Sequence, residues 1–172
     1  MTLRVRLLSS IILLLAGMFL TPALFAQRFE GTHVALTSPQ LSAQFKAYEV
    51  WRIDVVQFDA YVKKESGTQG RAALLQLGKH QWRLELVPSG IIGPEYKLQV
   101  LSAKGLQTSQ PTEVKAYRGT ELNGYGHVRL TVDEDFISGF VMEGQKRWYI
   151  EPLWYHDFSA DRDLFVVYDR DQ

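Results

Sequence analysis

The fold of this chain is decided by residues 117–153, YRGTELNGYGHVRLTVDEDFISGFVMEGQKRWYIEPL, in which short apolar runs alternate with turn residues. Within the runs, apolar and polar side chains tend to alternate, which is the pattern of a β-strand with one buried face. Asn123-Gly124 and Glu143-Gly144 suit tight hairpin turns, because Gly adopts left-handed backbone angles at little cost and Asn tolerates them. The runs are Tyr125–Val132, Phe136–Met142 and Trp148–Leu153. We therefore expect consecutive antiparallel strands here.

The same pattern continues on both sides of this stretch. Further runs of strand length are Ala73–Leu77, Trp82–Leu86, Tyr96–Val100, Val114–Tyr117 and Leu164–Tyr168. The first two are joined by a tight turn at Gly78-Lys79-His80, and Lys104–Pro111 is a polar stretch between strands. No segment after residue 26 has a 3.6-residue apolar stripe longer than about two turns. The sequence therefore predicts an all-β fold, an antiparallel sandwich or open barrel of short strands.

Residues 48–62 are interpreted as a long strand that opens the β domain, residues 48–172. The alternation of apolar and polar residues slips by one position at Val55-Val56, which indicates a β-bulge. A helix is disfavoured because the segment is rich in β-branched and aromatic residues, and because Asp54 and Asp59 would interrupt its apolar stripe. Residues 27–47 precede it as an extended N-terminal arm with little structure of its own.

The N-terminus has the order of a secretory signal peptide. Arg4 and Arg6 precede the apolar stretch Leu7–Leu20, which Thr21-Pro22 ends. The stretch is shorter than the roughly 20 residues that cross a bilayer. We expect a signal-peptide helix within residues 1–26, cleavage between Ala26 and Gln27, and a protein that is secreted or periplasmic (extracytoplasmic). The membrane would be met only transiently, through the signal peptide.

Composition limits the classes of function. The chain has 172 residues, enough for one compact domain with a sizeable core. Its 19 basic and 19 acidic side chains cancel, so no uniform positive field attracts nucleic acid, and we expect no such partner. The absence of cysteine excludes disulfides, thiolate zinc sites and cysteine nucleophiles.

Residues with catalytic or metal-binding chemistry are scattered. The histidines are His33, His80, His127 and His156, and the acidic clusters are Asp133-Glu134-Asp135 and Asp157, Asp161 and Asp163. No H-E-x-x-H helix, calcium-loop glycine, nucleophile elbow or phosphate loop accompanies them. We therefore expect no enzyme activity, no metal and no cofactor. The aromatic residues Trp51, Phe58, Trp82, Trp148, Tyr149 and Trp154 fit either a strand core or a sugar-binding face.

Four segments follow one another in a distinctive order: Tyr117–Thr120, Gly124–Leu130, Ile137–Val141 and Trp148–Leu153. In this order, the segments contain an aromatic-x-Gly pattern, a strand of small residues, a strand in which Gly precedes hydrophobic residues, and the sequence Tyr-Ile-Glu-Pro. This order resembles that of the propeptide domain of reprolysin-type (M12B, ADAM-like) zinc metalloproteases. Trp82–Pro88 and Leu164–Asp171 are also similar, so the resemblance covers residues 48–171. The motif positions are Gly119, Gly126, Gly139, Tyr149, Ile150, Glu151 and Pro152.

Physical chemistry gives a reason for some motif positions. Gly139 would let two backbones approach closely or accept a bulge, and Pro152 would end a strand ladder because it has no N–H to donate. Glu151 points away from the face that Ile150 occupies, so it should reach solvent or a partner.

The resemblance implies a prosegment, a domain that assists the folding of a zinc protease and inhibits it. The protease's zinc-binding helix, with two histidines flanking a glutamate, is absent from these 172 residues. The partner would therefore be a reprolysin-type catalytic domain in cis or in trans, and without cysteine the chain cannot block the zinc through a thiolate. The alternative is an extracellular β-sandwich binding module for glycan or protein.

Overall fold

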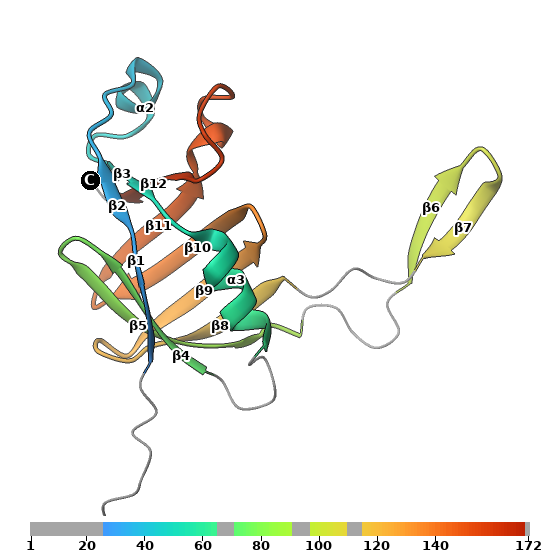
Figure 1. Ribbon diagram of the computed structural model, residues 1–172, viewed down its shortest axis with the longest axis horizontal. Helices are drawn as coiled ribbons and strands as arrows, with labels where there is room; N and C mark the ends of the chain where they lie inside the picture. Colours follow the sequence, from blue (N-terminus) through green and yellow to red (C-terminus); the bar gives the residue numbers. More distant parts are fainter. Residues whose placement is uncertain (1–25, 65–70, 91–96, 110–114, 171–172) are drawn as a thin grey trace, which may run out of the picture.

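The computed structural model describes residues 26–64, 71–90, 97–109 and 115–170 (Figure 1). Apart from Ala26, the expected signal peptide lies outside these ranges. None of the helices in the described ranges has the length and apolar character needed to cross a membrane. Strands dominate the structure, so the predicted all-β class is confirmed.

Ten strands form one twisted, nearly closed sheet in the order β1-β4-β5-β8-β9-β10-β11-β12-β3-β2. The strands are β1 (Gln27–Glu30), β2 (Thr32–Val34), β3 (Glu49–Arg52), β4 (Arg71–Leu77), β5 (His80–Pro88), β8 (Ala116–Glu121), β9 (Gly126–Asp133), β10 (Phe136–Glu143), β11 (Lys146–Pro152) and β12 (Leu164–Asp169). Neighbours are antiparallel, as expected, except that β1 pairs with β4 in parallel. The hairpins predicted around residues 117–153 are present in the expected order.

The prediction that residues 27–47 form an extended arm with little structure of its own is wrong. These residues form two strands and a helix, and the two strands connect the opposite edges of the sheet. β1 and β2 lie at opposite ends of the strand order but are joined by Gly31 alone. The Gly31 N–H donates to the carbonyl of Gln76 at 2.9 Å, and a Cβ on Gly31 would lie 2.5 Å from Leu77 Cδ2. A short helix, α2 (Pro39–Gln44), follows with Ser38 as its N-cap. Strands this short carry no local signal, because distant partners provide their hydrogen bonds.

The long bulged strand expected over residues 48–62 is also wrong. The chain leaves β3 after Arg52 and forms α3 (Val55–Lys64). Asp54 begins this helix by accepting a hydrogen bond from the Gln57 N–H at 3.0 Å. Asp59 is buried and pairs with Lys63 Nζ at 2.8 Å, one helical turn later. The two aspartates taken as evidence against a helix therefore support it.

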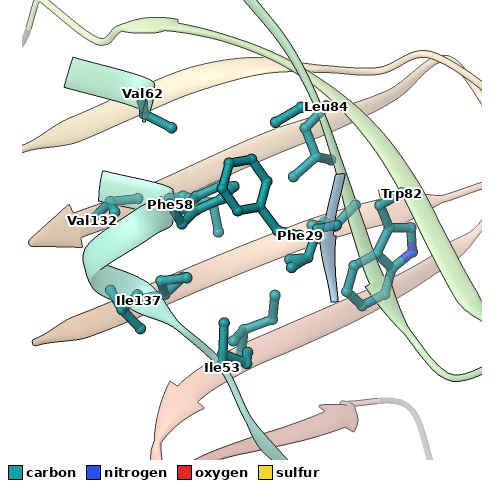
Figure 2. Close-up of a cluster of buried hydrophobic side chains, with 14 of the residues drawn as sticks. Phe29, Ile53, Phe58, Val62, Trp82, Leu84, Val132 and Ile137 are labelled. Atoms are coloured by element: carbon teal, nitrogen blue, oxygen red, sulfur yellow. The ribbon is translucent and has the colours of Figure 1, made fainter. Parts of the chain in front are cut away.

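The main core fills the space between the sheet and α3, which lies across the concave face of the sheet (Figure 1). Phe29 of β1 packs edge-on against Phe58 of α3, with ring centroids 5.0 Å apart. Figure 2 shows both rings among side chains from the sheet.

A smaller core lies on the opposite face, beside α2 and the 3-10 helix η1 (Leu153–Tyr155). Its buried members are Leu41, Val50, Leu153, Leu164 and Val166.

A separate two-stranded sheet is formed by β6 (Leu98–Ser102) and β7 (Gly105–Ser109). β7 lies within the stretch expected to be a polar connection, so that expectation is wrong at this point.

Candidate functional site

One row of side chains crosses five neighbouring strands of the main sheet. The strand registers place Arg118 of β8 opposite Arg129 of β9, and Arg129 opposite Phe140 of β10. Phe140 lies opposite Tyr149 of β11, and Tyr149 lies opposite Tyr168 of β12. Directly paired residues project from the same face of a sheet, so all five share one face. These five residues are called the Arg–aromatic row below.

The row lies on the outer face of the sheet, away from α3. Leu130 and Ile150, which neighbour row residues along β9 and β11, are buried in the main core. Side chains alternate between the two faces of a strand, so the row must point outward. Arg118 and Arg129 are exposed, and the three aromatic residues are half-buried. With strands about 4.8 Å apart, the row is about 19 Å long.

The aromatic half of the row is a continuous series of ring contacts, in which Tyr149 and Tyr168 are stacked and Phe140 is tilted against Tyr149. The Phe140 and Tyr149 ring centroids are 6.0 Å apart, and those of Tyr149 and Tyr168 are 5.3 Å apart. Phe45, just after α2, extends the series, with its ring centroid 4.1 Å from that of Tyr168 and its ring plane tilted by 33°. The Arg147 guanidinium lies 4.9 Å from the centre of the Phe140 ring, in cation–π contact. Rings held by neighbours in this way lose little conformational freedom when a partner binds.

Two hollows flank the row. The first has a volume of about 450 Å³, and its lining includes Arg118, Arg129, Ser138 and Phe140. The described residues around it include no acidic side chain. The first hollow therefore favours an anionic group.

The second hollow, of about 390 Å³, lies at the aromatic end of the row. Tyr149 and Tyr168 line it together with the basic Lys46 and Arg170 and the acidic Glu151 and Asp169. Asp169 is buried, so Glu151 is the more accessible of the two carboxylates. This hollow offers both hydrogen-bond donors and hydrogen-bond acceptors beside aromatic rings.

The three motif glycines allow strands to approach one another. A Cβ would lie 1.8 Å from the carbonyl oxygen of Glu85 if placed on Gly119, and 1.9 Å from that of Met142 if placed on Gly126. On Gly139 it would lie 2.0 Å from the carbonyl oxygen of Arg129, and φ there is 149°. The predicted close approach at Gly139 is confirmed. These glycines give β8, β9 and β10 the spacing that supports the row.

The Tyr-Ile-Glu-Pro motif occupies β11. Tyr149 belongs to the row, and Ile150 is fully buried on the other face. Pro152 is the last residue of β11 paired with β12, and η1 begins immediately after it, as its missing N–H led us to expect. Glu151, which we expected to reach solvent or a partner, is half-buried, and its Oε2 lies 3.1 Å from His156 Nε2 of the same chain. His156 Nδ1 in turn lies 2.9 Å from Gln44 Oε1 of α2.

The remaining candidate residues do not gather at the row. His33 and His127 are exposed on β2 and β9. Asp133 ends β9, Glu134 and Asp135 form the turn to β10, and residues 157–163 lie between η1 and β12. Within the described ranges, no three histidine or acidic side chains lie together as a metal-ligand group.

His80 was expected in a turn but is the first residue of β5 and is buried. The turn itself consists of Gly78 and Lys79. Trp51, Phe58 and Trp82 are buried in the core, which supports the core interpretation of these aromatics over the sugar-binding one.

Sequence reasoning missed Arg118, Arg129, Phe140 and Tyr168 as site residues. Arg118 and Arg129 are the polar positions of alternating strands, and they face each other once the hairpin turn is placed. The strand register that follows from the hairpin turn could therefore have placed the two arginines opposite each other. The contribution of Phe45 had no such signal, because it depends on where α2 packs.

Comparison of the chain with protein-family models and with curated proteins found no match.

Proposed function

We propose that this chain is a propeptide-like domain that binds a reprolysin-type zinc protease, assists its folding and inhibits it. The observation that carries the proposal is the position of the resembling motif relative to the open face. Gly119, Gly126 and Gly139 set the spacing of the strands beneath the Arg–aromatic row, and Tyr149 is part of the row itself. The resembling residues and the surface best suited to binding thus coincide.

The residue types of the row suit a protein partner. Arg and Tyr are enriched among the residues that dominate protein–protein binding energy. The row combines both in a rigid strand platform, so little entropy is lost when a partner docks. Arg118 and Arg129, with Arg147 over Phe140, make one end of the face basic. The complementary surface of the partner would therefore be acidic.

Inhibition would follow from coverage of the partner's active-site cleft. A stable interface of ordinary size buries about 800 Å² on each partner. The row and its two hollows provide a continuous surface for such an interface. No thiolate is needed, because burial of the cleft alone excludes substrate. Binding only the folded protease would also favour folding by mass action.

The glycan-binding alternative is favoured less by the geometry. Sugar-binding faces use exposed aromatic rings, but Trp51 and Trp82 are buried. The rings that line the second hollow, Tyr149 and Tyr168, are only half-exposed and stack on each other. We therefore keep the protein partner as the proposal.

The test uses purified residues 27–172 and the catalytic domain of a reprolysin-type protease encoded in the same genome. We expect stoichiometric inhibition of peptide cleavage and a higher yield of active protease when it is refolded with the domain present. The proposal fails if neither cleavage nor refolding yield responds to the domain. Binding of glycans on an array, with no effect on protease, would instead support the alternative module.

A further inference from the structure

A buried histidine lies at one end of the main core, among three tryptophans. The imidazole of His80 is 4% exposed. Its ring centroid is 5.1 Å from that of Trp82, in a stacked arrangement, and 4.3 Å from that of Trp148. Trp51 completes the group, and a Cβ on Gly78 would lie only 2.7 Å from Trp51 Cη2, so the β4–β5 turn can approach this ring only with glycine at that position. We call Trp51, His80, Trp82 and Trp148 the Trp–His plug.

Two carboxylates flank the imidazole, one on each ring nitrogen. Glu49 Oε2 lies 3.9 Å from His80 Nε2, and Glu143 Oε2 lies 3.9 Å from His80 Nδ1. These separations are too long for hydrogen bonds. Each carboxylate instead accepts from an indole N–H, Glu49 from Trp51 at 3.2 Å and Glu143 from Trp82 at 3.5 Å. His80 Nε2 is buried and has no hydrogen-bond partner within the described residues.

Other charged and titratable groups surround the plug. Lys79 Nζ, in the β4–β5 turn, lies 3.3 Å from Glu49 Oε1, and Lys146 Nζ of β11 lies 5.7 Å from the centre of the Trp148 ring. His33 of β2 meets Trp51 edge-on, and Asp169 of β12 lies opposite Trp148. The two lysines oppose a positive charge on His80, whereas Glu49 and Glu143 favour it.

We propose that His80 is an acid-sensitive switch in which uptake of one proton draws Glu49 and Glu143 from the tryptophans to the imidazolium and loosens this end of the barrel. The neutral ring has one N–H, but the imidazolium has two and needs an acceptor on each side. Glu49 and Glu143 are the acceptors placed there. Each must move about 1 Å closer to reach hydrogen-bond distance, and in both carboxylates the Oε2 atom that faces the imidazole is the one that accepts from the indole N–H.

Burial is the main cause of a lowered pKa for His80, and Glu49 opposes it. The unfolded chain then binds the proton at a higher pH than the folded chain does. The stability contributed by the neutral ring is present above the ordinary histidine pKa of about 6.5 and is lost as the pH falls below it. The plug therefore weakens in mild acid, whatever partner the domain binds.

Two measurements test the switch on residues 27–172. The first follows the His80 ring signals by NMR in isotope-labelled protein, and we expect a midpoint below about 6.5. The Glu49→Gln and Glu143→Gln variants should each lower that midpoint further, because each removes an acceptor for the imidazolium. A midpoint at or above 6.5, or one that neither variant moves, overturns the proposal.

The second measurement compares urea unfolding of wild type and His80→Gln between about pH 8 and about pH 5. The wild type should lose more stability on acidification than the variant does. His127→Gln, which removes an exposed histidine, should keep the wild-type profile. Identical pH profiles for wild type and His80→Gln contradict the switch. If His80→Gln does not fold, the NMR midpoint decides alone.

Discussion

Tyr149 and Tyr168 stack across β11 and β12 with 13° between their ring planes, yet their pKa values move in opposite directions. The Arg147 guanidinium, which donates to the Tyr149 hydroxyl, lowers the pKa of Tyr149. Burial, together with the nearby Glu151, raises the pKa of Tyr168 to about 12. Within this stacked pair, Tyr149 therefore belongs to the open, basic part of the row, and Tyr168 belongs to the covered part beside α2.

The raised pKa of Tyr168 predicts a loss of stability at high pH. The unfolded chain releases this proton near the ordinary pKa of about 10, before the folded chain does. The stability contributed by the protonated hydroxyl is present below that pH and is lost as the pH rises toward about 12. Tyr168→Phe should therefore lose less stability than wild type over this interval. Urea unfolding at several pH values checks this, and equal losses would contradict it.

Glu121 should be important for stability. Its buried carboxylate accepts hydrogen bonds from the backbone N–H groups of Arg83, Asn123 and Gly124 at 3.2, 3.1 and 2.5 Å. Glu121→Ala leaves these donors without an acceptor and should cost roughly 3 kcal/mol of unfolding free energy. Glu134→Gln, in the exposed next turn, should change it by less than about 0.5 kcal/mol. Similar effects of the two substitutions on urea unfolding would refute this role.

The close approach of β8 to β5 should make Gly119 intolerant of a side chain. An alanine Cβ would lie 1.8 Å from the Glu85 carbonyl oxygen, and the backbone that carries this atom cannot move without disturbing the sheet. We expect Gly119→Ala to cost roughly 3 kcal/mol or to prevent folding. Thr120→Ala is the adjacent control, and its melting temperature should stay close to that of wild type. A stable Gly119→Ala domain would show that the strands are spaced more widely.

Signal-peptide cleavage gives a prediction about the compartment. Expression of the full chain in a bacterium should yield an extracytoplasmic protein that begins at Gln27, as determined by mass spectrometry. Ala26→Leu should slow processing, because the cleavage site requires a small residue. A cytoplasmic product that keeps Met1 would contradict the expected localisation.

The strands around residues 117–153 could be predicted because each hairpin combines local alternation with suitable turn residues. The helix α3 could not be predicted in this way, because Phe58 and Val62 fit the alternation of a strand, although together with Val55 they also fit the i, i+3, i+7 spacing of a helix. The decisive signal was Asp54, whose side chain begins the helix. Asp residues are common at this position.

The site was less predictable than the strands. Tyr149 and Glu151 were found through the family resemblance, but alternation alone does not distinguish a binding residue from any other outward residue. The row exists because three successive hairpin registers and the β11–β12 pairing align Arg118 with Tyr168 through three intermediate strands. Register errors add across strands, so this alignment needed the structure. The burial of His80 likewise depends on strands that are distant in the chain.

The Arg–aromatic row is the surface proposed to bind the protease. Its most direct test is the affinity of a reprolysin-type catalytic domain for residues 27–172, measured by calorimetry for wild type and for Arg118→Glu/Arg129→Glu. Two charge reversals at a complementary interface should weaken binding by about 100-fold or more. The matched control, Lys64→Glu/Lys104→Glu, makes the same charge change at two exposed positions outside the row and should bind within about threefold of wild type. Equal affinity of all three proteins would show that the row does not bind the protease.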